Sequence, residues 1–315
     1  MGRILVTRHL PTGGLAPLAG HEIVGPHDDD RPMTAAELRE HARTCDAVVC
    51  LLTDRIDAAV LAAGAEGGRL RVVANVAVGY DNVDVAAART HGIAVCNTPG
   101  VLDETTADLA FALILAATRL TSTAEADLRA GRWQGWKITE YLGRDVHGAN
   151  LGIVGYGRIG RAVARRAAGF SMTVRHHTRH DTGEPGWVAD LDDLLETSDI
   201  VSLHVPGGDA TRHLLDERRI GLLRPTAVLV NTARGPVVDE AALAEALHSG
   251  RLFAAGIDVY EREPEIHPRL LTAPRTVLWP HLGSASHETR VRMATTATSA
   301  VATILAGGTP TNLVS

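Results

Sequence analysis

The sequence predicts an α/β protein with two doubly wound parallel-sheet domains, and three observations support this fold class. The chain has 315 residues, more than one hydrophobic core usually holds, so two domains are expected. Short apolar runs alternate with alanine-rich helical stretches, which is the pattern of βα units. Residues 151–160 read LGIVGYGRIG, an apolar strand that leads into closely spaced glycines and a helix.

The first part of the chain predicts one parallel sheet. Strands are expected at 4–6, 47–52, 70–76 and 93–96, with helices near 34–43, 57–63 and 84–91. The N-terminal run MGRILVT has no extended apolar segment, so it indicates a first strand rather than a signal peptide, and we expect a cytoplasmic protein.

A long helix is expected after the turn-forming sequence NTPG at 97–100. It begins near Asp103 and carries a face of small and apolar residues suited to close packing: Ala107, Ala110, Leu113, Ile114 and Ala117. Its most apolar part, 109–117, is too short to span a bilayer, so we interpret it as a buried helix and expect no membrane partner.

The second sheet is expected to begin with a strand at 151–154. A helix follows at 161–170, and further strands are expected at 173–175, 200–204, 227–231, 254–257 and 276–278. These runs build a doubly wound sheet. An amphipathic segment at 286–305 lies beyond this sheet, and the sequence leaves open whether it returns to the first domain.

Charge and cysteine content exclude several classes of function. The chain has 31 Lys plus Arg against 37 Asp plus Glu, and its basic residues are scattered, so no nucleic-acid partner is expected. Cys45, Cys50 and Cys96 are odd in number and have no metal-ligand spacing, which indicates free thiols in a reducing compartment. We therefore expect neither a metal site nor a disulfide framework.

The glycines at 155–160 have the spacing that a dinucleotide pyrophosphate requires. Gly155 allows a tight turn, Gly157 lets the backbone approach the phosphates, and Gly160 lets the helix pack on the strand. The free N–H groups of the helix N-terminus then point at the anion. The alternative is a glycine-rich turn in an ordinary α/β unit.

Side chains at the ends of predicted strands suit the reduction of a 2-keto acid by a nicotinamide, which needs a cation, a proton donor and a group that keeps the donor charged. Arg234 follows the strand 227–231, and its planar fork suits a carboxylate, although a structural ion pair is the alternative. His281 follows a strand end, and an imidazole is the natural acid at neutral pH. Glu263 lies on a neighbouring loop, but from spacing alone Glu261 and Glu265 are equal candidates for its partner.

Six motifs in order resemble the D-isomer-specific 2-hydroxyacid dehydrogenases over essentially the whole chain. They are NVAVGYDNVD at 75–84, GYGRIG at 155–160, HVP at 204–206, NTARG at 231–235, GIDVY at 256–260 and PHLGS at 280–284. The resemblance implies that Arg234 binds substrate, that His281 is the acid/base and that Glu263 is its partner. It also implies a Rossmann-type cofactor domain, 99–284, inserted into a flavodoxin-like substrate domain made of 1–98 and 285–315.

Further roles are implied by the resemblance, residue by residue. Val78 and Gly79 present backbone N–H groups to the substrate carboxylate, and Asp258 orients the nicotinamide amide. Apart from the resemblance, we expect Leu51, Leu52 and Thr53 to line the substrate pocket. The remaining implied cofactor contacts are made mostly through backbone or hydroxyl groups: Thr106, Arg158, Ile159, Val205, Pro206, Thr211, Thr232, Ala233, Gly283 and Ser284.

The segment GRWQGW at 131–136 is most similar to the glyoxylate and hydroxypyruvate reductases of this family. In that branch the second tryptophan, Trp136 in this sequence, can close the active site of a neighbouring subunit. We expect a homodimer joined through the helix from Asp103 and the loop from Trp133 to Trp136, because an alanine-rich face and exposed rings otherwise lack a partner. Local packing of the rings is the alternative.

The cofactor preference is expected to depend on the residues after the strand at 173–175. Thr178 stands where an acidic residue would accept the ribose hydroxyls of NAD(H), and Arg179 follows it. A missing acid and a present cation favour NADP(H), with NAD(H) and a role for Asp181 as alternatives. The expected function is therefore NAD(P)H-dependent reduction of a small 2-keto acid to a D-2-hydroxy acid.

Two other functions remain open from the sequence. A D-3-phosphoglycerate dehydrogenase shares these motifs, but the chain stops at Ser315 without a regulatory domain. A nucleotide-sensing protein similar to the family's transcriptional co-repressors would keep the same Arg, Glu and His. No extended interaction tail flanks the core, which disfavours this second alternative.

Overall fold

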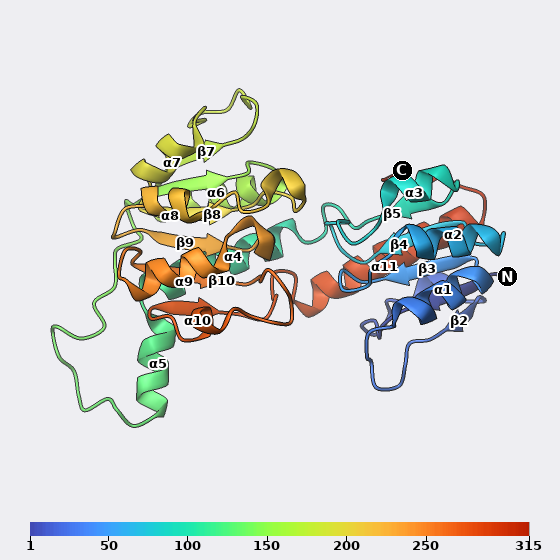
Figure 1. Cartoon of the computed structure of the whole chain (residues 1–315), viewed down its shortest axis with the longest axis horizontal. Helices are drawn as coiled ribbons and strands as arrows, with labels where there is room; N and C mark the ends of the chain where they lie inside the picture. The colour runs from blue at the N-terminus through green and yellow to red at the C-terminus, as the bar shows by residue number, and fades with distance from the viewer. Residues whose placement is uncertain (315) are drawn as a thin grey trace. The chain divides into compact units, whose positions relative to one another are not determined.

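The computed structural model of the chain describes residues 1–314, and these form two compact units. Unit 1 is Met1–Leu102 together with the chain from Ser284 onward, and unit 2 is Asp103–Gly283 (Figure 1). From the sequence, the boundaries between the two domains are expected between residues 98 and 99 and between residues 284 and 285. Each unit contains one parallel sheet with helices packed on it, which confirms the predicted fold class.

The sheet of unit 1 has five strands in the order β2-β1-β3-β4-β5. They are β1 (Arg3–Val6), β2 (Glu22–Val24), β3 (Ala47–Cys50), β4 (Val72–Asn75) and β5 (Ala94–Cys96). Every residue of β3 and β4 is buried, so these strands are continuous apolar runs in the sequence. The edge strand β2 has no buried residue, and for this reason sequence reasoning missed it.

The helices of unit 1 begin at polar capping residues. Asp57 caps α2 (Ala58–Glu66) and Asp84 caps α3 (Val85–Thr90), while Thr34 forms a capping box at the start of α1 (Ala35–Thr44). The segment at 286–305 forms α11 (His287–Leu305), which packs on β3 and β4 of this unit. The C-terminal helix thus belongs to the same core as the N-terminal strands.

The sheet of unit 2 has six strands in the order β11-β10-β9-β8-β6-β7, and every pair is parallel. They are β6 (Asn150–Val154), β7 (Thr173–His177), β8 (Ile200–Leu203), β9 (Val228–Asn231), β10 (Ala254–Ile257) and β11 (Thr276–Leu278). The order reverses between β6 and β8. Doubly wound sheets bind ligands at such a switch point, beyond the carboxyl ends of the strands.

The helices of unit 2 connect and cover these strands. They are α4 (Asp103–Thr118), α5 (Thr121–Arg129), α6 (Arg158–Ala168), α7 (Leu191–Thr197), α8 (Glu217–Leu222), α9 (Glu240–His248) and α10 (Pro268–Leu271). Short 3₁₀ turns add η1 (Ala16–Leu18) in unit 1, and η2 (Asp209–Thr211) and η3 (Gly235–Val237) in unit 2. The helix α6 starts three residues earlier than expected, directly after Gly157.

The small-residue face of α4 packs on the sheet of its own unit. Ala107, Ala110 and Ile114 are fully buried, and a side chain at Gly256 of β10 would approach Leu113 to 3.1 Å. The alanine-rich face therefore has a partner already, and this part of the argument for a homodimer is wrong. Among the described residues, no single helix is long and apolar enough to cross a membrane, although the bent pair of α4 and α5 passes by length and composition.

Candidate active site

The turn between β6 and α6 has the geometry that its three glycines predict. Gly155 has φ +94°, and a side chain there would come within 2.7 Å of the His204 carbonyl group, which follows β8. A side chain at Gly160 would collide with the carbonyl oxygen of Gly155. Both positions therefore require glycine, one for backbone conformation and both for close approach.

The space above this turn suits a dinucleotide. A side chain at Gly157 would meet no atom within 4 Å, so the backbone is open on that side. Gly157 also caps α6 without a side-chain hydrogen bond, which leaves the first N–H groups of the helix available to an anion. The hydroxyl of Thr232 is buried and has no hydrogen-bond partner within the described chain. Buried polar groups are usually hydrogen-bonded, so this hydroxyl is a candidate to bind a ligand.

The backbone around Arg234 is held by Asn231 at the end of β9. The Asn231 side chain accepts from the Ala233 N–H at 3.0 Å and donates to the Arg234 carbonyl oxygen at 3.0 Å. The Arg234 guanidinium donates to the Ala233 carbonyl oxygen at 2.9 Å. A side chain at Gly235 would collide with the carbonyl group of Tyr260, so the Arg234 loop packs directly on the loop that carries Glu263.

His281 and Glu263 form a hydrogen-bonded pair. Nδ1 of His281 lies 2.8 Å from Oε2 of Glu263, and the two side chains are 26% and 28% exposed. Oε1 of Glu263 accepts from the Tyr260 N–H at 3.0 Å, which fixes the carboxylate. Nε2 of His281 has no hydrogen bond to the described residues and is therefore available to a substrate.

Charge and burial act in opposite directions on Glu263. Burial acts to raise the pKa of Glu263, and the hydrogen bond and charge of His281 act to lower it. The Tyr260 N–H and the positive charge of Arg234 add to the stabilisation of the carboxylate, so its pKa lies below the ordinary value. The carboxylate beside the His281 ring is therefore charged at neutral pH.

The geometry distinguishes the three carboxylates that spacing left as equal candidates. Of these three carboxylates, only that of Glu263 hydrogen-bonds to the His281 ring within the described residues. The Glu261 carboxylate instead contacts Nε2 of His213 at 3.1 Å and accepts from the Glu240 N–H at 3.0 Å. Glu265 is exposed, and its N–H donates to the Arg262 carbonyl oxygen at 2.8 Å.

Asp258 lies buried beneath the His281 loop. Its carboxylate accepts from the N–H groups of Leu282 at 2.7 Å and Gly283 at 2.9 Å, and its carbonyl oxygen accepts from the His281 N–H at 2.8 Å. Burial raises the pKa of Asp258 to about 6, against the opposing effect of these N–H groups and of His281. His281 itself has φ +55°, a left-handed conformation that these hydrogen bonds hold in place.

In unit 1, the predicted substrate-binding peptide of Val78 and Gly79 has its carbonyl oxygens bound on one side. Asn97 donates to the Val78 oxygen at 2.8 Å, and Asn75 donates to the Gly79 oxygen at 2.8 Å. The N–H groups of Val78 and Gly79 make no hydrogen bond to the described residues. Sequence reasoning missed both asparagines, although Asn75 ends an apolar strand and Asn97 opens the NTPG turn.

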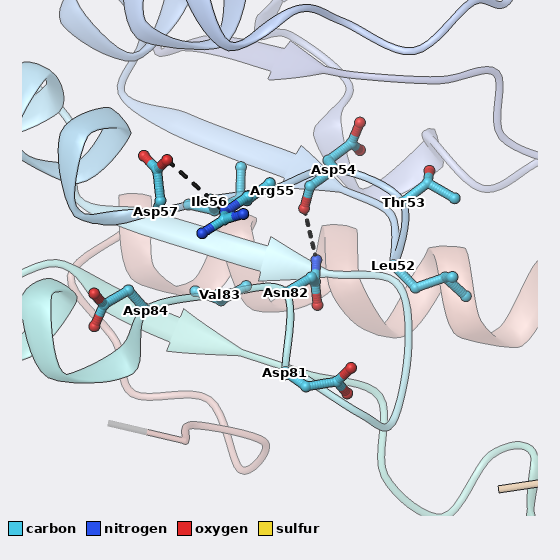
Figure 2. A pocket seen from close by; sticks show the side chains of 10 residues that line it. All are labelled: Leu52, Thr53, Asp54, Arg55, Ile56, Asp57, Asp81, Asn82, Val83 and Asp84. Atoms are coloured by element: carbon cyan, nitrogen blue, oxygen red, sulfur yellow. Dashed lines mark hydrogen bonds and ion pairs between the residues drawn. The ribbon is translucent and has the colours of Figure 1, made fainter. Parts of the chain in front are cut away.

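A pocket of about 400 Å³ lies in unit 1, between the loop after β3 and the loop after β4 (Figure 2). Residues 52–57 and 81–84 line it, so it includes Leu52 but neither Val78 nor Gly79. Buried Asp54 fixes the first loop: its carboxylate accepts from Thr7 at 2.5 Å and from the Leu51 N–H at 2.8 Å. The Asp54 carbonyl oxygen accepts from Asn82 at 2.9 Å, the contact drawn in Figure 2.

The predicted cofactor-specificity residues directly follow β7. The Thr178 hydroxyl donates to the His180 carbonyl oxygen at 2.7 Å, which folds the loop tightly. Arg179 is exposed and makes no ion pair with the described residues. The other predicted contacts lie around the switch point and along its loops: Arg158 and Ile159 in α6, Val205, Pro206 and Thr211 after β8, Thr232 and Ala233 after β9, Gly283 after β11 and Thr106 in α4. Ser284 falls at the start of the last segment of unit 1.

The tryptophans that were expected at an interface are exposed. Trp136 is 79% exposed and Trp133 is 50% exposed, on the long loop that follows α5. Figure 1 shows α5 and this loop extending away from the sheet of unit 2. Ile138 and Leu142 on the same loop are 74% and 64% exposed, so four large apolar side chains of this loop are half exposed or more.

Comparison with known proteins gives consistent matches. Residues 111–283 match the family model for the NAD binding domain of D-isomer specific 2-hydroxyacid dehydrogenases. A glyoxylate reductase of Korarchaeum cryptofilum is 47% identical over 99% of this chain and 95% of its own length. A protein of known structure from Thermus thermophilus is 42% identical, with a TM-score of 0.92 over 99% of this chain and 100% of that one. A Sinorhizobium meliloti NADPH-dependent glyoxylate/hydroxypyruvate reductase, solved with NADP and malonate, is 33% identical, with a TM-score of 0.87 over 99% of this chain and 96% of that one.

Proposed function

Because this chain belongs to the D-isomer-specific 2-hydroxyacid dehydrogenase family, we propose that it reduces small 2-keto acids of the glyoxylate and hydroxypyruvate type to D-2-hydroxy acids. The observation that carries the proposal is the His281–Glu263 pair beside the Arg234 loop. The names of its glyoxylate reductase relatives support the substrate class.

The residues of unit 2 suit a nicotinamide dinucleotide. The pyrophosphate would lie at the N-terminus of α6, over the open side of Gly157. The unpaired hydroxyl of Thr232 and the carboxylate of Asp258 would bind the rest of the cofactor through hydrogen bonds. When bound, the reduced nicotinamide supplies the hydride that the carbonyl carbon receives.

His281 supplies the proton that the reduction needs. The hydrogen bond from Nδ1 to Glu263 fixes the ring and leaves Nε2–H to donate to the developing alkoxide. Carbonyl carbon and oxygen thus receive a hydride and a proton, and the ketone becomes a hydroxyl group. In the oxidative direction the neutral ring takes the proton back.

Each unit, taken by itself, offers groups whose polarity suits a carboxylate. Arg234 provides a planar cation that can make two parallel hydrogen bonds. In unit 1, the N–H groups of Val78 and Gly79 make no hydrogen bond to the described residues, and Asn97 and Asn75 hold the carbonyl oxygens of the same two residues. Such a pair of N–H groups is a common anion-binding arrangement.

The decisive experiment follows NADPH and NADH oxidation with glyoxylate, hydroxypyruvate, pyruvate and bulkier 2-keto acids. We expect turnover with the two smallest substrates and a decline with increasing side-chain size. An absence of turnover with every 2-keto acid and both cofactors would refute the proposal. 3-Phosphohydroxypyruvate belongs in the same screen, because it tests the alternative substrate class directly.

We propose further that NADP(H) is the preferred cofactor. Exposed Arg179 and the absence of an acidic side chain at position 178 support this preference. A cation next to the ribose favours a 2′-phosphate, whereas NAD(H) binding usually uses a carboxylate at this position. The relative from Sinorhizobium meliloti is itself described as NADPH-dependent.

We also propose that two copies of the chain associate through the loop after α5. Four large apolar side chains on this loop are exposed: Trp133, Trp136, Ile138 and Leu142. Such a concentration on one loop is typical of an interface. Light scattering at micromolar concentration should give the mass of a dimer, and Trp136→Ala should weaken it. A monomeric mass for the wild type would reject this proposal.

A further inference from the structure

The buried carboxylate of Glu240 has no role in the reaction proposed above. Glu240 is 6% exposed and is the first residue of α9. It is not needed to cap that helix, because the side chain of Asp239 accepts from the Ala242 N–H at 3.0 Å. A carboxylate is expensive to bury unless hydrogen bonds compensate it. The hydrogen-bond partners of the Glu240 carboxylate therefore indicate its structural role.

Both oxygens of Glu240 bind backbone N–H groups of the loop that carries Glu263. Oε1 accepts from the Glu261 N–H at 2.5 Å, and Oε2 accepts from the His267 N–H at 3.0 Å. Glu263 lies between these two residues in the sequence. One carboxylate thus fixes both ends of a short loop, and hydrogen bonds to a charged acceptor are the stronger kind.

The contact between Glu240 and the loop is reciprocal. The Glu261 carboxylate accepts from the Glu240 N–H at 3.0 Å, so each residue binds the backbone of the other. On the other side of the loop, the hydroxyl of Tyr260 donates to the Trp279 carbonyl oxygen at 2.9 Å, two residues before His281. The loop is therefore tied to α9 at one side and to the His281 segment at the other.

We propose that Glu240 is a positioning residue: it holds the loop 261–267 in place and thereby keeps Glu263 in hydrogen-bond contact with His281. The catalytic importance of this role rests on the proposed function, whereas the hydrogen bonds of Glu240 do not depend on it. Within the described residues, the Glu240 carboxylate hydrogen-bonds to the backbone of the Glu263 loop and not to His281, so it acts through that backbone. Loss of its two hydrogen bonds would let Glu263 move away from the ring.

Other charged groups surround this loop and must be separated from Glu240 in a test. His213 lies 3.1 Å from the Glu261 carboxylate and 3.8 Å from Asp239, and Arg212 lies 3.9 Å from Glu261. Beside the pair itself stand Arg234 and Asp258. A pH-dependent change at the His213 ring would look like one at His281. Each Glu240 variant is therefore also made in a chain that carries His213→Asn.

The test replaces Glu240 by Gln in the full chain. Gln keeps the size of the side chain but presents an NH₂ group to one of the two N–H donors, which breaks one hydrogen bond and adds a repulsive contact. Glu240→Asp is the milder second variant, because it keeps the charge and withdraws the carboxylate by one methylene group. Glu245→Gln is the matched control on the same helix, since Glu245 is 58% exposed and pairs with Arg269.

Two measurements distinguish a role of Glu240 in placing Glu263 from a role in overall stability. The first is the pH midpoint of the His281 ring signal, measured by NMR in substrate-free protein. The signal is assigned by its loss in His281→Asn. The second is the high-pH limb of kcat/KM for 2-keto acid reduction, together with the KM for the cofactor. We expect Glu240→Gln to move both midpoints to lower pH by at least about half a unit, a threefold change in the protonation equilibrium, with the cofactor KM unchanged. Glu240→Asp should move them in the same direction, and Glu245→Gln should move neither.

Each outcome decides the inference. Unchanged His281 midpoints in folded Glu240→Gln or Glu240→Asp would overturn it, and so would an equal shift in Glu245→Gln. If Glu240→Gln fails to fold, Glu240→Asp carries the same prediction. If the wild type turns over no 2-keto acid, the proposed function fails, whereas the NMR midpoints still report whether Glu240 keeps Glu263 against the ring.

Discussion

Replacement of Glu263 by Gln should move the reductive pH profile to lower pH. The variant keeps the shape of the side chain and its contact with the Tyr260 N–H, but it removes the charge that lies 2.8 Å from Nδ1 of His281. The pKa of Glu263 lies below its ordinary value, so in the wild type this carboxylate is charged throughout the assay range. Without that charge the protonated ring is less stable, and reduction loses its proton donor at a lower pH.

The size of the shift follows from the geometry of the pair. A hydrogen bond between charged groups is worth about 1.5–3 kcal/mol, and 1.36 kcal/mol corresponds to one pH unit. Because the two side chains are 26% and 28% exposed, solvent screens part of this energy, and the lower half of the range applies. We therefore expect the limb to move by about one pH unit.

The assay is kcat/KM for 2-keto acid reduction between pH 5 and 9 at saturating cofactor. The oxidative direction should show the opposite trend, because it uses the neutral ring as a base. Glu265→Gln is the matched control, since that carboxylate is exposed and lies two residues away on the same loop. A limb that stays in place in Glu263→Gln, or that moves equally in Glu265→Gln, would show that the pair does not set the protonation of His281.

Three further predictions test the other groups of the site. Arg234→Ala should lower kcat/KM at least about a hundredfold without changing the KM for the cofactor, and a comparable loss of cofactor binding would contradict a role toward the substrate. The wild type should prefer NADPH over NADH by at least about tenfold in kcat/KM; Arg179→Ala should remove most of this preference and Thr178→Asp should reverse it. A wild type that prefers NADH would point to Asp181 instead. Because burial raises the pKa of Asp258 to about 6, its carboxylate becomes a neutral, weaker acceptor below that pH, so the KM for the cofactor should rise as pH falls through about 6. Asp258→Asn should flatten this dependence, and a pH-independent KM in the wild type would exclude Asp258 from cofactor binding.

Much of the architecture could be predicted because it depends on local sequence. Strands β3, β4, β8 and β9 are buried along their whole length, so each is a continuous apolar run. The edge strand β2 has no such run and was missed. The glycine motif at 155–160 was also predictable from local sequence. At Gly155 a positive φ and a close backbone approach allow no other residue.

The sequence also proposed Arg234 and His281 as candidate site residues, because ligands of an open α/β sheet bind beyond its strand ends and both residues follow predicted strands. It could not distinguish Glu261, Glu263 and Glu265, which lie within five residues of one another. Nor could it show that the small face of α4 packs on its own sheet, or that Asn75 and Asn97 orient the Val78–Gly79 peptide.

What the sequence by itself determined is the buried strands, the dinucleotide-type turn and the strand ends that Arg234 and His281 follow. All of these follow from backbone preferences and burial periodicity over a few neighbouring residues. Only the tertiary structure decided which carboxylate meets His281, 18 residues further along the chain. That contact depends on side chains far apart in sequence, such as Glu240 and Tyr260, which fix where a loop lies once the chain has packed.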